Sequence, residues 1–195
     1  LAFTLAIEKY GVSAASSSLV TGYHDAHYAL EQTIAQWLNK ERVLLFSSGF
    51  AANCGFLSAV DRKDNHFILD KLSHASLIDG ASQGLSQFSR FKHNDIAHLQ
   101  HRLSNASSRY KTVVAESIYS MDGDLAPVAS MQSICQQSNA LLYIDDAHGI
   151  GVLGESGEGI SAQTNNDTVI MATFGKAIGT GGACIACNEF NFREA

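Results

Sequence analysis

The stretch that decides the fold of this chain is Val169-Ile170-Met171-Ala172-Thr173-Phe174-Gly175-Lys176, a short apolar run that leads into a glycine and a lysine. A second run, Ala140-Leu141-Leu142-Tyr143-Ile144, lies upstream and leads into Asp145-Asp146-Ala147-His148-Gly149. Apolar runs this short and continuous are typical of strands that are covered on both faces of a sheet. The chain therefore places charged and polar residues directly after two buried strands.

Runs of this kind recur along the chain, and segments of helical period separate most of them. They fall at 42–47, 66–70, 87–91, 111–117, 140–145, 168–173 and 182–187. Strands that alternate with helices imply βαβ units, so we predict a three-layer α/β/α fold with a mostly parallel sheet of about seven strands. The connection at 175–181 is too short for a crossover helix, and the last strand is therefore predicted to be antiparallel.

The segments between the runs carry the marks of helices. One apolar face at 30–38 is formed by Leu30, Ile34, Trp37 and Leu38. Another, at 96–103, begins after Asp95, a residue suited to cap a helix. Pro127 can open the helix that follows it. Residues 1–10 also read as a helix, and the serine- and alanine-rich stretch at 13–18 reads as a loop.

Composition restricts the class of protein. Of the 195 residues, 46% are hydrophobic and 16% are charged, which indicates a packed globular core. The net charge of −6 comes without a basic cluster, so we expect no nucleic-acid partner. No apolar stretch approaches the roughly 20 residues of a membrane span, so we expect no membrane partner. The four cysteines are too few and too scattered for a secreted disulfide framework, which favours a reduced, cytoplasmic compartment.

The lysine and the acid–histidine pair form the arrangement that a pyridoxal 5'-phosphate (PLP) site requires. A lysine amine can form a Schiff base with the cofactor aldehyde, and a carboxylate can pair with the pyridinium nitrogen. Ligands of open α/β sheets bind beyond the carboxyl ends of the strands. We therefore predict that Lys176 is the covalent anchor, that Asp145 pairs with the ring nitrogen, and that His148 bonds the phenolic oxygen of the cofactor.

Other candidate cofactor contacts also follow predicted strands. The turn that contains Gly49 and Phe50 opens a helix whose first amides can bind a phosphate, and the hydroxyl of Thr173 can join them. His74 is a candidate for stacking on the cofactor ring, and Ser120 for a polar contact. Each has a structural alternative: a capped turn, a strand-end threonine, a structural histidine and a turn serine.

Alternatives also exist for the charged residues. Asp145 can cap a helix or pair with His148 on a metal, but further ligands at a fitting spacing are missing, so we predict no metal. Lys176 can be a solvated surface lysine; the glycine spacing around it is wrong for a Walker loop. Cys184 and Cys187 lie within an apolar strand, where two buried small hydrophobes are favoured over a redox or zinc pair.

Five motifs occur in a fixed order along the chain. They are Ser-Gly-Phe-Ala-Ala-Asn at 48–53, Leu-Ser-His-Ala-Ser at 72–76, Ser-Met-Asp-Gly-Asp at 120–124, Asp-Asp-Ala-His-Gly at 145–149 and Thr-Phe-Gly-Lys at 173–176. Together they resemble the α-oxoamine synthase family of fold-type I PLP enzymes, over about residues 1–190. The resemblance implies a PLP-binding large domain at 25–190, preceded at 1–24 by a helix and the serine-rich loop.

The resemblance also implies roles for the site residues. Lys176, His74, His148 and Asp145 would be catalytic, with Lys176 as the Schiff-base lysine and the base that removes the α-proton of the substrate. The resemblance implies a homodimer, as in other family members. The sequence of residues 145–154 is similar to that of the family members that condense L-alanine with a pimeloyl thioester, which CoA or a carrier protein carries. The alternatives are a glycine-using member, a plain aminotransferase, and a catalytically incompetent PLP-fold fragment that only dimerises.

Two departures from the family pattern bear on these expectations. The family loop before Leu-Val-x-Gly-Tyr is rich in glycine, whereas here only Gly11 remains and residues 12–18 are Val-Ser-Ala-Ala-Ser-Ser-Ser. Because alanine and serine are strained at positive φ, we expect an altered loop geometry. Both ends of the chain also read as cut, and we expect a C-terminal small domain beyond it.

Overall fold

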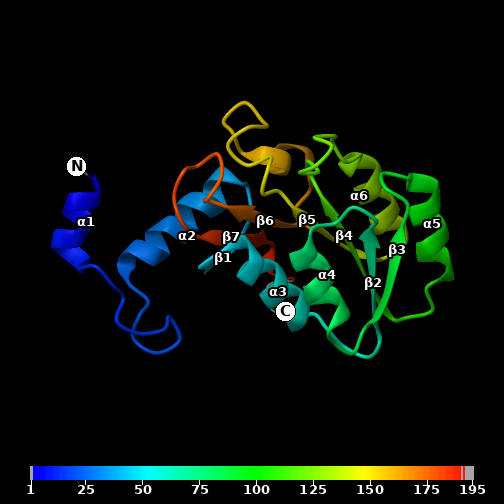
Figure 1. Cartoon of the computed structure of the whole chain (residues 1–195), viewed down its shortest axis with the longest axis horizontal. Coiled ribbons are helices and arrows are strands. Elements are labelled where there is room, and N and C mark those ends of the chain that lie inside the picture. The colour runs from blue at the N-terminus through cyan, green and yellow to red at the C-terminus, as the bar shows by residue number, and fades with distance from the viewer. Residues whose placement is uncertain (1, 190, 192–195) are drawn as a thin grey trace.

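The structure is a computed structural model that describes residues 2–189 and 191, and Figure 1 shows its elements along the chain. The helices are α1 (Ala2–Tyr10), α2 (Asp25–Trp37), α3 (Gly49–Ala59), α4 (Ala75–Ser82), α5 (Ile96–Asn105), α6 (Val128–Gln137) and a 3-10 helix (Gly159–Gln163). The strands are β1 (Arg42–Phe46), β2 (Asn65–Asp70), β3 (Gln87–Phe91), β4 (Tyr110–Glu116), β5 (Leu141–Asp145), β6 (Val169–Thr173) and β7 (Ala183–Cys187).

The strands form one seven-stranded sheet in the order β1-β7-β6-β5-β4-β2-β3. Strands β3, β2, β4, β5 and β6 pair in parallel, whereas β7 runs antiparallel to both β6 and β1. The predicted parallel sheet, its strand positions within one or two residues, and the antiparallel last strand are therefore confirmed. The connection after β6 contains no helix, which leaves β7 to return directly beside β6.

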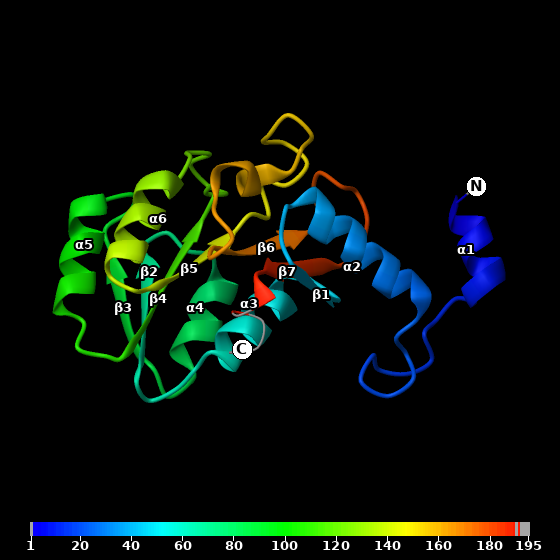
Figure 2. The same ribbon diagram turned by 180° about the vertical axis from the view of Figure 1, so that it is seen from behind.

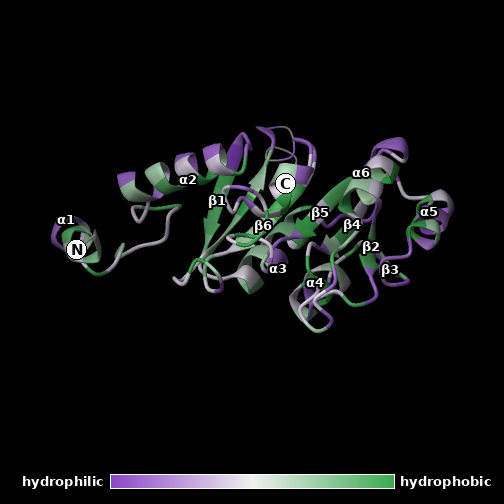
Figure 3. Ribbon diagram, turned by 90° about the horizontal axis from the view of Figure 1, so that it is seen from above, coloured by the Kyte–Doolittle hydropathy of each residue, from purple (hydrophilic) through white to green (hydrophobic). Residues whose placement is uncertain are grey.

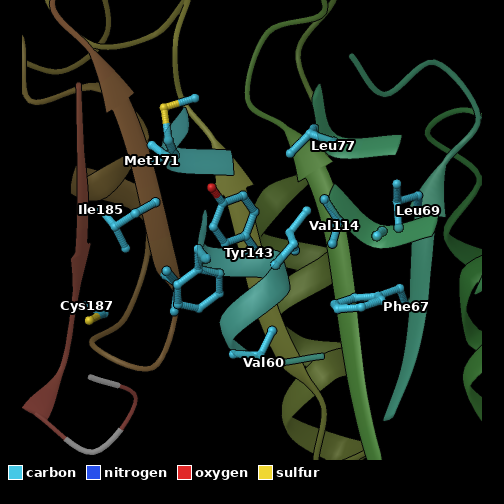
Figure 4. Close-up of a cluster of buried hydrophobic side chains, with 14 of the residues drawn as sticks. Val60, Phe67, Leu69, Leu77, Val114, Tyr143, Met171, Ile185 and Cys187 are labelled. Carbon is cyan, nitrogen blue, oxygen red and sulfur yellow. The ribbon is translucent and has the colours of Figure 1, made fainter. Parts of the chain in front are cut away.

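Helices cover both faces of the sheet, as Figures 1 and 2 show from opposite sides. On one face α3 and α4 pack against alternate side chains of the strands, and Figure 4 shows this cluster around Tyr143 and Phe67. On the other face α5 and α6 pack on Ile68, Val113 and Ile144, and α2 packs on the β1–β7 end of the sheet. The predicted three layers are confirmed, and Figure 3 shows the hydrophobic colour concentrated in the strands.

Local signals explain where several helices begin. The Asp95 carboxylate accepts the amide hydrogen of His98 at 2.8 Å, which caps α5 as predicted. Pro127 is the residue directly before α6, also as predicted. The apolar face predicted for α2 is wrong at Leu30, which is 44% exposed, because the helix turns only its second half toward the sheet, at Ile34, Ala35 and the following Leu38.

The N-terminal segment lies apart from the sheet in both Figure 1 and Figure 2. The helix predicted at 1–10 is confirmed for Ala2–Tyr10, and the stretch at 13–18 is a loop as predicted. Within that loop Ala15 has a φ of 58°, the left-handed conformation that disfavours alanine. The strain expected from the missing glycines therefore falls on Ala15. Among the residues that the structure describes, no helix is long and apolar enough to cross a membrane.

Candidate active site

Buried carboxylates mark the end of the sheet at which its parallel strands finish, here called the carboxyl edge. Asp70, Glu116 and Asp145 are the last residues of β2, β4 and β5, and Thr173 is the last residue of β6. These four strands are neighbours in the sheet. Glu116 and Asp145 are paired in register, so two acids lie side by side. The strand ends thus gather the charged groups that a ligand at this edge would meet.

Asp145 is a buried carboxylate that accepts hydrogen bonds from two neutral groups. Its Oδ2 accepts a hydrogen bond from Nδ2 of Asn53 at 2.8 Å, and its Oδ1 accepts one from the Ala147 amide at 3.0 Å. The Tyr143 hydroxyl donates to Oδ1 of Asn53 at 2.6 Å, which fixes the amide orientation. Burial raises the pKa of Asp145 above its ordinary value, against the hydrogen bond from Asn53. A cation or N–H donor in this site would bring the pKa down and restore the charge.

Lys176 and His148 meet at the same edge. Lys176 Nζ lies 2.8 Å from Nε2 of His148, within hydrogen-bonding distance. Lys176 is exposed and His148 half-buried, and partial burial together with the Lys176 charge lowers the pKa of His148. The neutral imidazole that this favours can accept a hydrogen from the lysine amine. The predicted proximity of these two residues is thus present.

His74 connects to the acids through a chain of hydrogen bonds. Its backbone amide donates to Oε1 of Glu116 at 2.6 Å, and its Nδ1 lies 2.8 Å from Oγ of Ser76. The same Oγ accepts from Nδ2 of Asn53, which in turn holds Asp145. The ring of His74 therefore stands at the start of α4 within the same network, and its stacking on a cofactor stays a prediction.

The predicted phosphate contacts lie at the start of α3. Ser48 caps this helix, because its Oγ accepts the Ala51 amide hydrogen at 3.2 Å. The amides of Gly49 and Phe50 come earlier in the first turn, where an anion is favoured by the helix dipole. A Cβ added to Gly49 would lie 3.5 Å from Cβ of Thr173, so these two residues are neighbours. The start of α3 and the end of β6 therefore face one another, as the prediction requires.

Ser120 is exposed in the loop between β4 and α6. That loop leaves the carboxyl edge directly after Glu116. Within the described part of the chain no hydrogen bond joins the Ser120 side chain to another candidate, so the cofactor contact predicted for Ser120 stays a prediction.

Two residues of this network were not predicted as site residues. Asn53 is a buried amide in a helix whose other buried positions are apolar, and it lies inside a motif that had been recognised. Glu116 ends an apolar strand, which is the same signal that identified Asp145. Burial and the neighbouring Asp145 raise the pKa of Glu116 to about 7. In both cases the signal was a polar residue in an apolar context.

The predicted burial of the two cysteines of β7 is confirmed. Cys184 and Cys187 are both buried, and they belong to clusters on opposite faces of the sheet. Residues three apart in a strand point to opposite faces, so the two thiols cannot act on one metal or form a pair. They pack as small hydrophobes.

Comparison with known proteins assigns the family. The chain belongs to the aminotransferase class I and II family, whose model matches residues 3–195. It is similar to a serine palmitoyltransferase variant from S. paucimobilis with a bound PLP–myriocin aldimine, with 33% identity and a TM-score of 0.91 over 97% of this chain and 50% of that one. It is also similar to the serine palmitoyltransferase of Sphingomonas wittichii, with 32% identity and a TM-score of 0.88 over 97% of this chain and 49% of that one.

A third similar structure is 8-amino-7-oxononanoate synthase from Francisella tularensis, with 27% identity and a TM-score of 0.83 over 99% of this chain and 54% of that one. The chain thus spans about half the length of the solved structures that it matches. The fold is that of the large domain of fold-type I PLP transferases.

The family and its PLP-bound neighbours indicate pyridoxal 5'-phosphate as the cofactor. The residues present fit this group. Asp145 is a buried carboxylate whose two hydrogen-bond donors are neutral, which suits it to a protonated ring nitrogen. Lys176 supplies an exposed amine, and the start of α3 beside Thr173 supplies an anion-binding helix end.

Proposed function

We propose that the protein containing this chain is an acyltransferase that condenses an amino acid with an acyl thioester and releases the thiol and carbon dioxide. The observation that carries the proposal is the placement of the Lys176 amine and His148 beside the buried Asp145 at the carboxyl edge. The similarity to serine palmitoyltransferases and to an 8-amino-7-oxononanoate synthase supports this reaction class.

Each candidate residue of the site would have its own role in this reaction. When bound, PLP supplies an electron sink that stabilises negative charge at the α-carbon of the amino acid. Asp145 would hold the proton of the ring nitrogen, with Asn53 fixing the carboxylate. Lys176 would take the α-proton on its Nζ, and His148 would orient that amine. His74, Ser120, Gly49, Phe50 and Thr173 would hold the cofactor in place.

For the substrates we propose L-alanine and a pimeloyl thioester, delivered by CoA or a carrier protein. The sequence of residues 145–154 supports this substrate pair, which is the pair that 8-amino-7-oxononanoate synthase uses. A second candidate is serine with a palmitoyl thioester, because the identity to serine palmitoyltransferases, 33%, exceeds the 27% to the 8-amino-7-oxononanoate synthase. We further propose that the full-length protein works as a cytoplasmic homodimer and that residues 25–190 are its cofactor-binding domain.

The cofactor claim is tested by reduction of the full-length protein with borohydride in the presence of PLP, followed by mapping of the labelled peptide. We expect the label on Lys176 and none in the Lys176→Ala variant. A label on another lysine would overturn the assignment. The exposed Lys63 provides the matched control, since Lys63→Ala should leave labelling unchanged.

The reaction class and substrates are tested with alanine, glycine and serine, each paired with pimeloyl-CoA and palmitoyl-CoA. Release of free thiol and carbon dioxide with alanine and pimeloyl-CoA would support the first substrate pair. A clear preference for serine and palmitoyl-CoA would support the second. Amino-group transfer to a keto acid without thiol release would contradict the acyltransferase proposal and indicate an aminotransferase.

A further inference from the structure

A second polar cluster lies beside the candidate site, at the end of β2. His93, from the loop between β3 and α5, stands between two carboxylates. Its Nδ1 lies 2.8 Å from Oδ1 of Asp70, and its Nε2 lies 2.7 Å from Oδ2 of Asp124. Asp70 is the last residue of β2, and Asp124 belongs to the loop at 117–127 that joins β4 to α6. His93 thus ties this loop to the sheet.

The two distances determine the charge state that this tie requires. An ionised carboxylate can only accept hydrogen bonds, so both ring nitrogens of His93 must donate. Only the imidazolium carries a hydrogen on both nitrogens. The Asp70 side chain is fully buried, with an exposed fraction of 0%, and an imidazolium beside it compensates the buried charge of the carboxylate. A neutral ring would leave one carboxylate facing a nitrogen lone pair.

Neighbouring groups strengthen the same tie. The Asn94 amide donates to Oδ2 of Asp70 at 3.0 Å, and its Nδ2 donates to Oδ2 of Asp124 at 2.7 Å. Asn94 adopts a left-handed φ of 52°, which asparagine tolerates better than most residues. The Tyr119 ring meets His93 edge-on, with centroids 4.4 Å apart. All of these contacts join the β2 end to the loop at 117–127.

The titratable groups that face the His93 ring come from two elements. Asp70 comes from β2, and Asp124 and Tyr119 come from the loop at 117–127. Glu116, at the end of β4, is one step further away and acts on Tyr119. Burial, followed by the Asp70 charge, raises the pKa of Tyr119 well above its ordinary value, so this hydroxyl stays neutral. The charge of the ring therefore depends on the two aspartates.

We propose that His93 is a positioning residue that holds the loop at 117–127, and with it Ser120, in the geometry that binds PLP, and that it does so most firmly while its ring carries both protons. This inference rests on the proposed function, because Ser120 is taken as a cofactor contact. Loss of one proton would break one of the two bonds to the carboxylates and weaken the tie, while the Asn94 bonds and the backbone hydrogen bond from Ser117 to Asp145, at 2.9 Å, keep the loop attached to the sheet.

The direction of the pH dependence follows from the charges. Partial burial lowers the pKa of His93, but the hydrogen bonds to Asp70 and Asp124 outweigh it and raise the pKa above 6.5. A group with a raised pKa contributes its full stabilisation below the unfolded value and loses it as the pH rises through the folded value. PLP binding should therefore weaken as the pH rises through the folded pKa of His93.

The test uses full-length protein with carbon-13-labelled histidine. NMR titration gives the pKa of His93, and a titration with PLP gives the dissociation constant at each pH. We expect a His93 pKa above 6.5. The dissociation constant of PLP should rise about tenfold across that pKa, which corresponds to the free energy of one hydrogen bond to a charged group. In His93→Gln the affinity should be about tenfold weaker below this pKa and should not change across it.

Asp124→Asn separates a positioning role from general instability. The substitution keeps the shape of the side chain but removes one of the two charges that hold the proton, so the pKa of His93 should fall. The midpoint of the PLP affinity change should move down with it. His101 in α5 is the matched control, since it is exposed and its ring Nδ1 lies 3.2 Å from Nδ2 of Asn105 in its own helix. The variant His101→Gln should behave as the unchanged protein.

Two results would overturn the inference. One is a His93 pKa at or below 6.5, and the other is a PLP affinity whose midpoint stays in place when the pKa shifts in Asp124→Asn. Absence of PLP binding at every pH would instead contradict the proposed function. The NMR titration distinguishes the two failures, because it reports the charge of His93 without cofactor.

Discussion

The two edges of the sheet carry buried groups of opposite charge. At the carboxyl edge, Asp70, Glu116 and Asp145 end neighbouring strands, and Asp145 accepts hydrogen bonds from two neutral groups. At the amino edge, where the parallel strands begin, Lys40 donates to the carbonyl oxygens of Asn165 and Thr168 at 2.6 and 2.9 Å. There the protein itself supplies the acceptors of Lys40, although burial still lowers the pKa of this lysine to about 8.

Asn65 illustrates the same point at the amino edge. Its Nδ2 donates to the Val60 carbonyl and its Oδ1 accepts from the Thr112 hydroxyl, both at 3.3 Å. A hollow of about 520 Å³ opens beside it, lined by Arg62 and Tyr110 among others. The hollow lies at the amino edge, whereas three buried acids, together with Lys176 and His148, lie at the opposite edge. The comparison teaches that a cluster of titratable groups with shifted pKa, rather than open volume, marks the site here.

The largest expected effect comes from the exposed lysine of the carboxyl edge. Lys176→Ala should lower turnover of the full-length protein by at least about 10³-fold, because it removes the covalent anchor and the proton acceptor together. The unfolding free energy should hardly change, since the side chain is exposed. Kinetic assays measure the turnover, and denaturant titrations measure the unfolding free energy. Turnover retained within tenfold would break the assignment of function to this edge.

The next effect concerns the paired acids. Burial and Asp145 raise the pKa of Glu116 to about 7, so the folded state holds this proton longer than the unfolded state does. That stabilisation is present at low pH and is lost as the pH rises from 4.5 to about 7. Glu116→Gln should therefore raise the unfolding free energy of the cofactor-free protein above pH 7, by up to about 3 kcal/mol.

The glutamine at position 116 can still accept the His74 amide hydrogen, so no other bond needs to be lost. The exposed Glu155 provides the control, and Glu155→Gln should leave the pH profile unchanged. Denaturant titrations across the pH range measure both variants. Equal stability of Glu116→Gln and the unchanged protein above pH 7 would mean that the carboxyl edge carries no unmet charge at Glu116.

Asp145→Asn should separate charge from packing. Loss of the ring-nitrogen partner should lower turnover by about 10²-fold. The unfolding free energy should change by no more than about 3 kcal/mol, because removal of the buried charge opposes the loss of one of the two hydrogen bonds that the carboxylate accepts. The neighbouring Asp146→Asn is the matched control. Asp146 is also buried and accepts the Ile160 amide hydrogen at 2.8 Å, but it adjoins the loop at 149–160. A larger loss of turnover in the control than in Asp145→Asn would reverse the assignment.

The smallest effect is expected at the amino edge. Asn65→Ala leaves the Thr112 hydroxyl without the Asn65 oxygen that accepts its hydrogen bond, and it should lower the unfolding free energy by about 1–3 kcal/mol. The affinity for PLP, measured by titration, should stay within twofold or so of the unchanged protein, which is about 0.4 kcal/mol. A clear loss of PLP affinity at a stability cost near zero would mean that the amino edge takes part in binding.

Local sequence predicted most of the fold. The inner strands β2, β4, β5, β6 and β7 contain continuous apolar runs, because a strand covered on both faces buries nearly every side chain, whereas the edge strands β1 and β3 are partly exposed. Asp95 and Pro127 mark helix starts through local hydrogen bonding and a fixed φ, so they too could be read directly. Leu30 was predicted wrongly because the helical period identifies an apolar stripe but not how far the sheet extends beneath it.

The site was predicted less completely. The candidates that end or follow strands, such as Asp145 and Lys176, were accessible because parallel topology brings the ends of strands to one edge. Asn53 and Glu116 were missed although each is a polar residue in an apolar context, and the His93 tie was missed because its partners lie many residues away in the chain. No periodicity records that Asn53 reaches Asp145 or that His93 bridges two carboxylates.

By itself the sequence determined the class of fold, the positions of its strands and the order of its motifs, because these depend on local hydrophobicity, turns and caps. The tertiary structure alone decided which charges are left unpaired. Burial and hydrogen bonding fix the ionisation of Asp145, Glu116 and His93, and these quantities depend on distances between residues that only folding brings together.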